Sequence, residues 1–200
     1  MKVKRIGALC KASKRCYLWN ELTEAGEIRR QWISNGEGLW PVSGLPMLSE
    51  SNLSTLFDFS PNQLKEMIVK EEALPEKLYG ILYDFAEGEE ALQESFIRLR
   101  KDGTEYMALT AGSRVIWLAT ELLRPCWGNQ PRLVRREIEE SDAIAVLDGL
   151  MLAGIIMPAI MGVDLYRELL RLGVSAPRPV TQPEEPPEDE DTDEDGGDEL

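Results

Sequence analysis

The last 22 residues of the chain restrict where a folded core can form. Residues 179–200 contain eleven Asp and Glu, no Lys or Arg and no aromatic residue, and prolines are frequent from Pro177 onward. A segment with so much charge and so few apolar groups cannot bury enough surface to offset the loss of chain entropy on folding. We therefore expect residues 176–200 to form a disordered acidic tail and the core to form within residues 1–175.

Charge is distributed unevenly along the rest of the chain. The net charge is −14, but the tail's eleven acidic residues leave 25 acidic against 22 basic residues in residues 1–178, a net charge of −3. Six basic residues precede the first acidic residue, Glu21: Lys2, Lys4, Arg5, Lys11, Lys14 and Arg15. A basic start and an acidic end indicate binding to nucleic acid, to an acidic surface or to the chain's own tail.

The residue types that the chain lacks exclude several kinds of catalytic site. It has no histidine, which excludes Ser-His-Asp and Cys-His nucleophilic sites and His-dependent metal sites. Cys10, Cys16 and Cys126 include no C-x-x-C pair, so we expect buried thiols rather than a disulfide framework or a zinc site. With no phosphate-binding glycine loop either, we predict no catalytic, cofactor-binding or metal-binding residues. Reduced cysteines and the absence of an apolar signal-peptide stretch near the N-terminus indicate a cytoplasmic protein.

Three short stretches near the N-terminus have the composition of β-strands. Residues 16–22, 28–33 and 39–42 are rich in aromatic and β-branched side chains, and turn-forming residues separate them. They predict an antiparallel meander. Because Pro41 cannot donate a backbone hydrogen bond, we expect the third strand to lie at the edge of its sheet.

Apolar spacing and capping residues predict the helices of the first half. Residues 2–14 place apolar side chains at helical spacing beneath a basic outer face. Residues 49–59 predict a short helix. Ser60 begins the next one, with Pro61 at its first position and Gln63 completing a capping box. The predicted buried stripe of this helix consists of Leu64, Met67 and Ile68.

A strong hairpin signal lies in the second half of the chain. Asp102-Gly103 separates two strand-like stretches, residues 96–100 and 105–109. This dipeptide favours a type I′ turn, in which both central residues have positive φ. Residues 115–118 predict a third strand beside this hairpin.

The apolar run at residues 143–157 fits either a helix or two strands. Asp148-Gly149 at its centre is natural in a hairpin and poor in a helix. A weak internal repeat favours the hairpin, because the windows 31–42, 107–118 and 144–155 each carry glycine at the sixth position and apolar residues at the third, ninth and twelfth. We therefore predict a strand, a glycine turn and a strand in each window.

Together these segments predict an α+β fold of short antiparallel β-meanders and hairpins with flanking helices and a disordered acidic C-terminal tail. Residues 1–75 hold the basic helix, the first meander and the helix pair. Residues 76–175 hold a predicted helix at 76–94, the second hairpin segment, the buried apolar run and a final helix that begins at Asp164. These two parts form either separate domains or one. Glycines and a proline interrupt residues 143–163, so we expect no membrane span.

Tryptophans and basic residues occur together in the first meander. Aromatic side chains on a sheet beside basic residues can stack on the bases of single-stranded nucleic acid. The alternative is that these large side chains supply the core of a small sheet. The candidate surface, for nucleic acid or for a protein partner, consists of ten residues: Lys2, Lys4, Arg5, Lys11, Lys14, Arg15, Trp19, Arg29, Arg30 and Trp32.

Four segments carry a resemblance to known proteins: Lys2-Val-Lys-Arg-Ile-Gly-Ala-Leu-Cys10, Gln31-Trp-Ile-Ser-Asn-Gly36, Leu56-Phe-Asp-Phe59 and Asp148-Gly-Leu-Met-Leu152. The resemblance is to small uncharacterised proteins encoded in bacterial prophages, which have a similar order of elements. It covers most of the chain ahead of the tail and implies a phage context. It assigns no chemical role to any residue.

These observations favour a non-enzymatic interaction protein. In this hypothesis the chain is a prophage accessory or morphogenesis factor that binds another protein through its sheet surfaces and acidic tail. The alternative is a single-stranded nucleic-acid-binding protein whose acidic tail competes for the binding groove. A third hypothesis is an enzyme that uses Asp or Glu. We expect no cofactor and no membrane partner.

Overall fold

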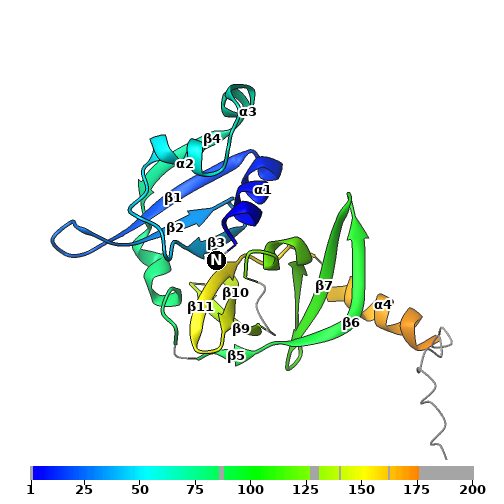
Figure 1. Ribbon diagram of the computed structural model, residues 1–200. Helices are drawn as coiled ribbons and strands as arrows, with labels where there is room; N and C mark the ends of the chain where they lie inside the picture. Colours follow the sequence, from blue (N-terminus) through cyan, green and yellow to red (C-terminus); the bar gives the residue numbers. More distant parts are fainter. Residues whose placement is uncertain (1, 86–87, 127–130, 140, 162, 176–200) are drawn as a thin grey trace, which may run out of the picture.

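A computed structural model describes residues 2–85, 88–126, 131–139, 141–161 and 163–175 (Figure 1). These residues form both helices and strands, with the strands mostly in consecutive runs, and every pair of adjacent strands except β1–β4 runs antiparallel. The predicted α+β fold is therefore confirmed. The predicted tail, residues 176–200, lies outside the described residues.

The described residues form two sheets, and the larger one has eight strands. Their order is β4 (Ile68–Ala73), β1 (Arg15–Leu22), β2 (Ile28–Ser34), β3 (Gly38–Pro41), β11 (Met151–Ile156), β10 (Ser141–Asp148), β9 (Arg132–Ile138) and β5 (Glu90–Ala91). β3 pairs with both β2 and β11, and Leu39 lies opposite Ile155. The first meander and the last hairpin therefore belong to one sheet, which residues 1–75 and 76–175 share.

The smaller sheet contains β6 (Gln93–Lys101), β7 (Thr104–Ala111) and β8 (Arg114–Ala119). Asp102 and Gly103 join its first two strands with φ of 52° and 83°, as the predicted turn requires. The strand–glycine–strand prediction is confirmed in all three windows. Gly36, Gly112 and Gly149 each have positive φ in the turns β2–β3, β7–β8 and β10–β11. The run at 143–157 is thus a pair of strands.

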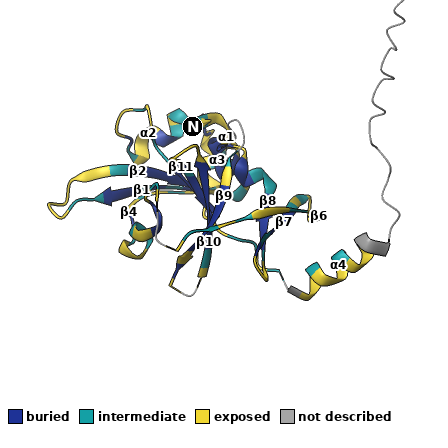
Figure 2. Cartoon of the chain, turned by 90° about the horizontal axis from the view of Figure 1, so that it is seen from below, coloured by how far each residue is buried: buried dark blue, intermediate teal, exposed yellow. Residues whose placement is uncertain are grey.

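Two apolar clusters cover opposite faces of the eight-stranded sheet, because side chains alternate along each strand. The first cluster contains Leu18 and Ile33 and lies against α1 (Val3–Ser13), α2 (Glu50–Leu56) and the smaller sheet. The second contains Trp32 and lies under a short 3₁₀ helix, η1 (Glu76–Ile81). Figure 2 shows much of the inner strands of this sheet, such as β1, β10 and β11, in dark blue, the colour of buried residues.

A third cluster joins the smaller sheet to the last helix, α4 (Val163–Ser175). Trp117 and Ala108 pack there against Tyr166, Leu169 and Leu170. Figure 1 shows α4 beside β6, on the side of the smaller sheet away from α1. None of the helices among the described residues is long and apolar enough to cross a membrane.

The capping box at Ser60 is present, but the helix that it begins is short. Ser60 Oγ accepts a hydrogen bond from Gln63 N at 3.3 Å, and Gln63 Oε1 accepts one from Ser60 N at 2.9 Å. α3 (Pro61–Glu66) then ends, and Ile68 begins β4, which runs parallel to β1. Ile68 N donates to Lys14 O at 2.9 Å, so pairing with β1 replaces the next helical turn.

The prediction that the strand at residues 39–42 lies at a sheet edge is wrong. β3 lies between β2 and β11. Pro41 is tolerated because β11 pairs only with Gly38 and Leu39, so no described strand faces Pro41 on that side.

The prediction of a helix at residues 76–94 is also wrong. Residues 76–81 form η1, and residues 90–91 and 93–101 are strands β5 and β6. The guanidinium of Arg136 on β9 explains the difference, because it donates to the carbonyl oxygens of Ile81 at 2.5 Å, Tyr83 at 2.6 Å and Asp84 at 3.2 Å. Carbonyl groups turned toward a distant arginine satisfy their hydrogen bonding without a continuing helix.

Candidate functional site

The six basic residues at the start of the chain lie on or beside α1. All but Lys11 are exposed. Neighbouring groups accept hydrogen bonds from several of them: Arg5 Nη1 donates to the carbonyl oxygen of Arg124 at 2.8 Å, Lys11 Nζ to that of Asp58 at 3.0 Å, and Lys14 Nζ to the Glu66 carboxylate at 2.8 Å. This side of the molecule therefore presents positive charge from one helix.

The tryptophans singled out in the first meander serve the core. Trp32 is fully buried, and Trp19, its partner in register, is half-buried. Glu21 accepts a bond from the Trp32 indole nitrogen at 3.4 Å and pairs with Arg29 at 3.5 Å and Arg30 at 4.0 Å. The core interpretation is therefore confirmed for Trp32, which has no face available to a nucleobase.

The ten residues of the candidate surface do not form one surface. α1 packs on the face of the sheet that carries Leu18 and Ile33, whereas Trp19 and Trp32 point from the opposite face toward η1. The structure thus separates the basic helix from the aromatic pair that was expected to accompany it.

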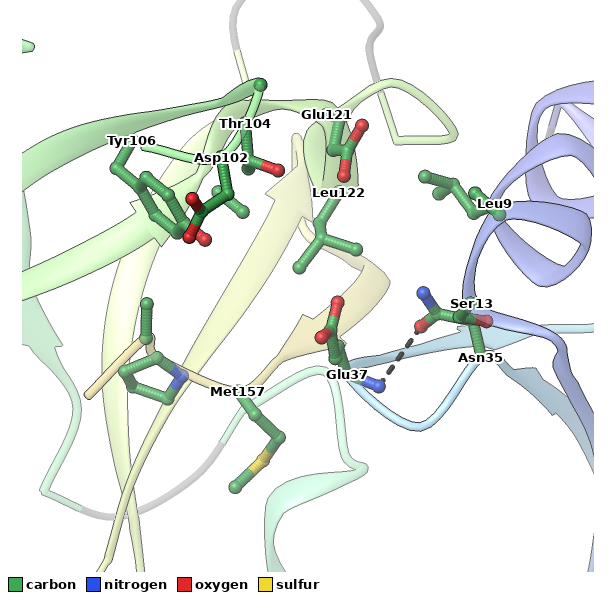
Figure 3. A pocket seen from close by; sticks show the side chains of 15 residues that line it. Leu9, Ser13, Asn35, Glu37, Asp102, Thr104, Tyr106, Glu121, Leu122 and Met157 are labelled. Atoms are coloured by element: carbon green, nitrogen blue, oxygen red, sulfur yellow. Dashed lines mark hydrogen bonds between the residues drawn. The ribbon is translucent and has the colours of Figure 1, made fainter. Parts of the chain in front are cut away.

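A cleft of about 530 Å³ lies between α1 and the β6–β7 hairpin, and we call it the acidic cleft. Its walls come from α1, the β2–β3 turn, the β6–β7 hairpin, the short 3₁₀ helix η2 (Thr120–Leu123) and residues 157–159. Glu37, Asp102 and Glu121 line it from three of these elements, and none of the described residues that line it is Lys or Arg. Figure 3 shows the three carboxylates around the opening.

Backbone hydrogen bonds hold Glu37 in place at the β2–β3 turn. Asn35 Oδ1 accepts from the backbone nitrogens of Glu37 at 3.1 Å and Gly38 at 2.8 Å. Ser34 Oγ accepts from the backbone nitrogen of Gly36 at 2.9 Å. Such side-chain bonds to the backbone two or three residues ahead make a defined turn. Asn35 is only 2 % exposed and also borders the cleft, where its Nδ2 donor has no partner among the described residues.

The other two carboxylates are also placed by local structure. Asp102 occupies the left-handed position of the β6–β7 turn, with φ of 52°. Glu121 lies in the first turn of η2. Neither side chain forms an ion pair or hydrogen bond with a described residue, and the same is true of Glu37.

The arrangement is suited to binding a cation that brings its own apolar stem. Glu37 and Asp102 are exposed and Glu121 is half-buried, so all three carboxylates are accessible from solvent. Leu9, Tyr106, Leu122 and Met157 add apolar surface between them (Figure 3). No group of three Cys, Asp or Glu among the described residues could hold a metal ion. A flexible Lys or Arg side chain fits both the charge and the apolar lining.

Sequence reasoning did not identify this cleft. Glu37, Asp102 and Glu121 lie far apart in the sequence, and each looks like an ordinary solvated acid in its own segment. The one available signal was the position of two of them, at a glycine turn. Such turns place side chains at the ends of a sheet, where loops gather.

Comparison with protein-family models, with curated proteins and with solved structures finds no match to this chain.

Proposed function

We propose that the chain is a non-enzymatic interaction protein that binds a basic segment of a partner protein in the acidic cleft. The observation that carries this proposal is a cleft of about 530 Å³ whose described lining residues include three carboxylates and no Lys or Arg. Carboxylates that have no partner within the described chain are available to one outside it. Charge complementarity of this kind governs partner choice and the rate of encounter.

The acidic tail also favours a positively charged partner. Residues 179–200 add eleven acidic residues and no basic one. A tail of this charge repels the cleft and attracts a cationic partner, which raises the rate of encounter at low ionic strength. The tail therefore acts with the cleft rather than as its occupant.

Single-stranded nucleic acid is the less well supported partner. Its phosphates would be repelled by the cleft and by the tail, and Trp32 cannot stack on a base because it is buried. The exposed basic residues of α1 supply positive charge but no accompanying aromatic platform.

The proposal also includes the cellular compartment and the biological context of this interaction. The three free, buried cysteines suit a reducing cytoplasm. The resemblance of residues 31–36 and 148–152 to prophage-encoded proteins supports the role of a phage accessory or morphogenesis factor.

Binding of a fluorescein-labelled peptide of six alternating Gly-Arg pairs, measured by fluorescence anisotropy at two salt concentrations, tests the proposal. In the full chain, the triple variant Glu37→Gln, Asp102→Asn, Glu121→Gln should weaken binding by about tenfold, since each exposed ion pair contributes about 0.2–1 kcal/mol. Asn at position 102 keeps a residue that tolerates positive φ.

The control variant removes three exposed carboxylates outside the cleft, Glu24→Gln, Glu27→Gln and Asp148→Asn, and it has the same net charge. It should bind the peptide within about twofold of the unaltered chain. If the two triple variants lose affinity equally, the peptide responds to overall charge or to the tail, and the proposal is wrong.

A further inference from the structure

A second, apolar cavity adjoins the acidic cleft. It has a volume of about 180 Å³, and we call it the apolar pocket. Its walls are formed mainly by Tyr17, Trp19, Leu78, Ile81 and Met157. Tyr17 and Trp19 stack with ring centroids 5.5 Å apart. Since water occupies about 30 Å³ per molecule, the pocket has room for one large aliphatic or aromatic side chain.

The two cavities share a wall. Glu37 and Met157 line both of them. Met157 N donates to the Glu37 carbonyl oxygen at 2.8 Å, so the residue after β11 is tied to the β2–β3 turn. The cleft lies toward α1, on one face of the eight-stranded sheet, and the pocket lies toward η1, on the other. The turn is the ridge between them.

We infer that the acidic cleft and the apolar pocket form one composite site for a peptide that carries a basic residue and a bulky apolar residue. This inference rests on the proposed function and specifies its partner. The basic side chain enters the cleft beside Glu37, the peptide crosses the ridge, and the apolar side chain enters the pocket beside Trp19.

The chemistry of the walls supports this occupant. The cleft attracts a cation through three carboxylates, whereas the pocket is lined almost wholly by apolar side chains, of which Met157 remains 40 % exposed. An exposed methionine at the rim adapts readily to an inserted side chain. Residues 179–200 of the chain itself are a poor fit, because they contain no basic residue.

The ridge is held in one conformation before any partner arrives. Gly36 has φ of 94°, and the hydrogen bonds to Ser34 Oγ and Asn35 Oδ1 close the turn on both sides of it. A site whose backbone is already ordered loses little conformational entropy on binding. The preformed ridge should therefore favour peptides with one particular spacing between the basic residue and the apolar residue.

The test uses fluorescein-labelled peptides in which one Arg and one Leu are separated by zero to three glycines, with matched peptides in which Ser replaces Leu. With the full chain, the best spacing should bind about tenfold more tightly than its Ser counterpart, as burial of one Leu side chain allows. Met157→Gln should reduce this preference to less than about threefold. Met151→Gln, an exposed methionine on β11 outside both cavities, should keep it.

The outcomes separate the two proposals. If Leu and Ser peptides bind equally at every spacing, or if Met151→Gln lowers the preference as much as Met157→Gln, the composite site is wrong. The proposed function still stands in that case, provided that neutralising Glu37, Asp102 and Glu121 weakens binding of the Arg peptides. If that neutralisation has no effect, the proposed function itself fails.

Discussion

Replacing Arg136 by methionine should destabilise the protein strongly. Arg136 is 2 % exposed, and its guanidinium donates to the carbonyl oxygens of Ile81, Tyr83 and Asp84 and to the carboxylate of Glu89. Met fills a similar volume but donates no hydrogen bond. In the variant these oxygens would have to find water or remain unsatisfied in a buried site.

The expected loss follows from the buried charge. Removing one partner of a buried ion pair costs about 3–5 kcal/mol, because the remaining charge is left without compensation. With a urea dependence of about 2 kcal/mol per molar, the unfolding midpoint should fall by roughly 2 M. The loss should begin in residues 76–85, since Arg136 holds this segment over the cluster that contains Trp32 and Leu82.

Urea unfolding followed by circular dichroism and tryptophan fluorescence measures the loss, and hydrogen exchange of residues 76–85 locates it. The control is Arg132→Met on the same face of β9, where the side chain is exposed. It should change the free energy of unfolding by less than about 0.5 kcal/mol. If Arg136→Met is equally mild, then the segment is held by apolar packing and the reasoning from the buried guanidinium is wrong.

Two further predictions concern the junction of β3 and β11. Gly154→Ala should lower the free energy of unfolding in urea by about 1–3 kcal/mol, because the new Cβ would lie 2.8 Å from the Trp40 ring and 2.9 Å from Cys126 Sγ. The control is Gly80→Ala, whose Cβ would have no atom within 4 Å and which should cost far less. Equal losses in the two variants would contradict the packing argument. Burial raises the pKa of Cys126 to about 12. The folded state therefore keeps a proton that the unfolded thiol releases near pH 8.5, and stability should be complete below that pH and decline by about 1.4 kcal/mol per pH unit from there toward pH 12. The free energy of unfolding, measured at pH 8, 9 and 10 with a reducing agent, should fall less steeply with pH in Cys126→Ala than in the unaltered chain. An equal fall in both would show that the Cys126 thiol is not the group responsible.

Hairpins were predictable because their signals are local. A glycine with positive φ between two apolar stretches sets both the turn and the alternation of the strands that it joins, as Gly36, Gly112 and Gly149 show. The third position of each window, Ile33, Leu109 and Val146, even lies in the same apolar cluster. No information from distant parts of the chain is needed to make these turns.

The secondary-structure predictions that were wrong concern segments where contacts with distant residues outweigh local preference. Residues 76–94 have helical spacing, yet Arg136, more than forty residues later, binds the carbonyl groups of this segment. Ile68 begins a strand because β1 offers a parallel partner, although the capping box at Ser60 predicted a helix through it. Such outcomes depend on which strands become neighbours, and sequence spacing does not carry that information.

The candidate site also depends on a contact between distant parts of the chain. Pro41 indicated an edge strand, and with β3 at an edge the β2–β3 turn would have no neighbouring β11. Because β3 does pair with β11, Met157 reaches the Glu37 carbonyl, and this single contact forms the wall common to the acidic cleft and the apolar pocket. The basic helix and the tryptophans attracted attention because their composition is unusual, but a binding site requires proximity. Here proximity comes from one strand pairing, so the partner's chemistry can be inferred only after that pairing is known.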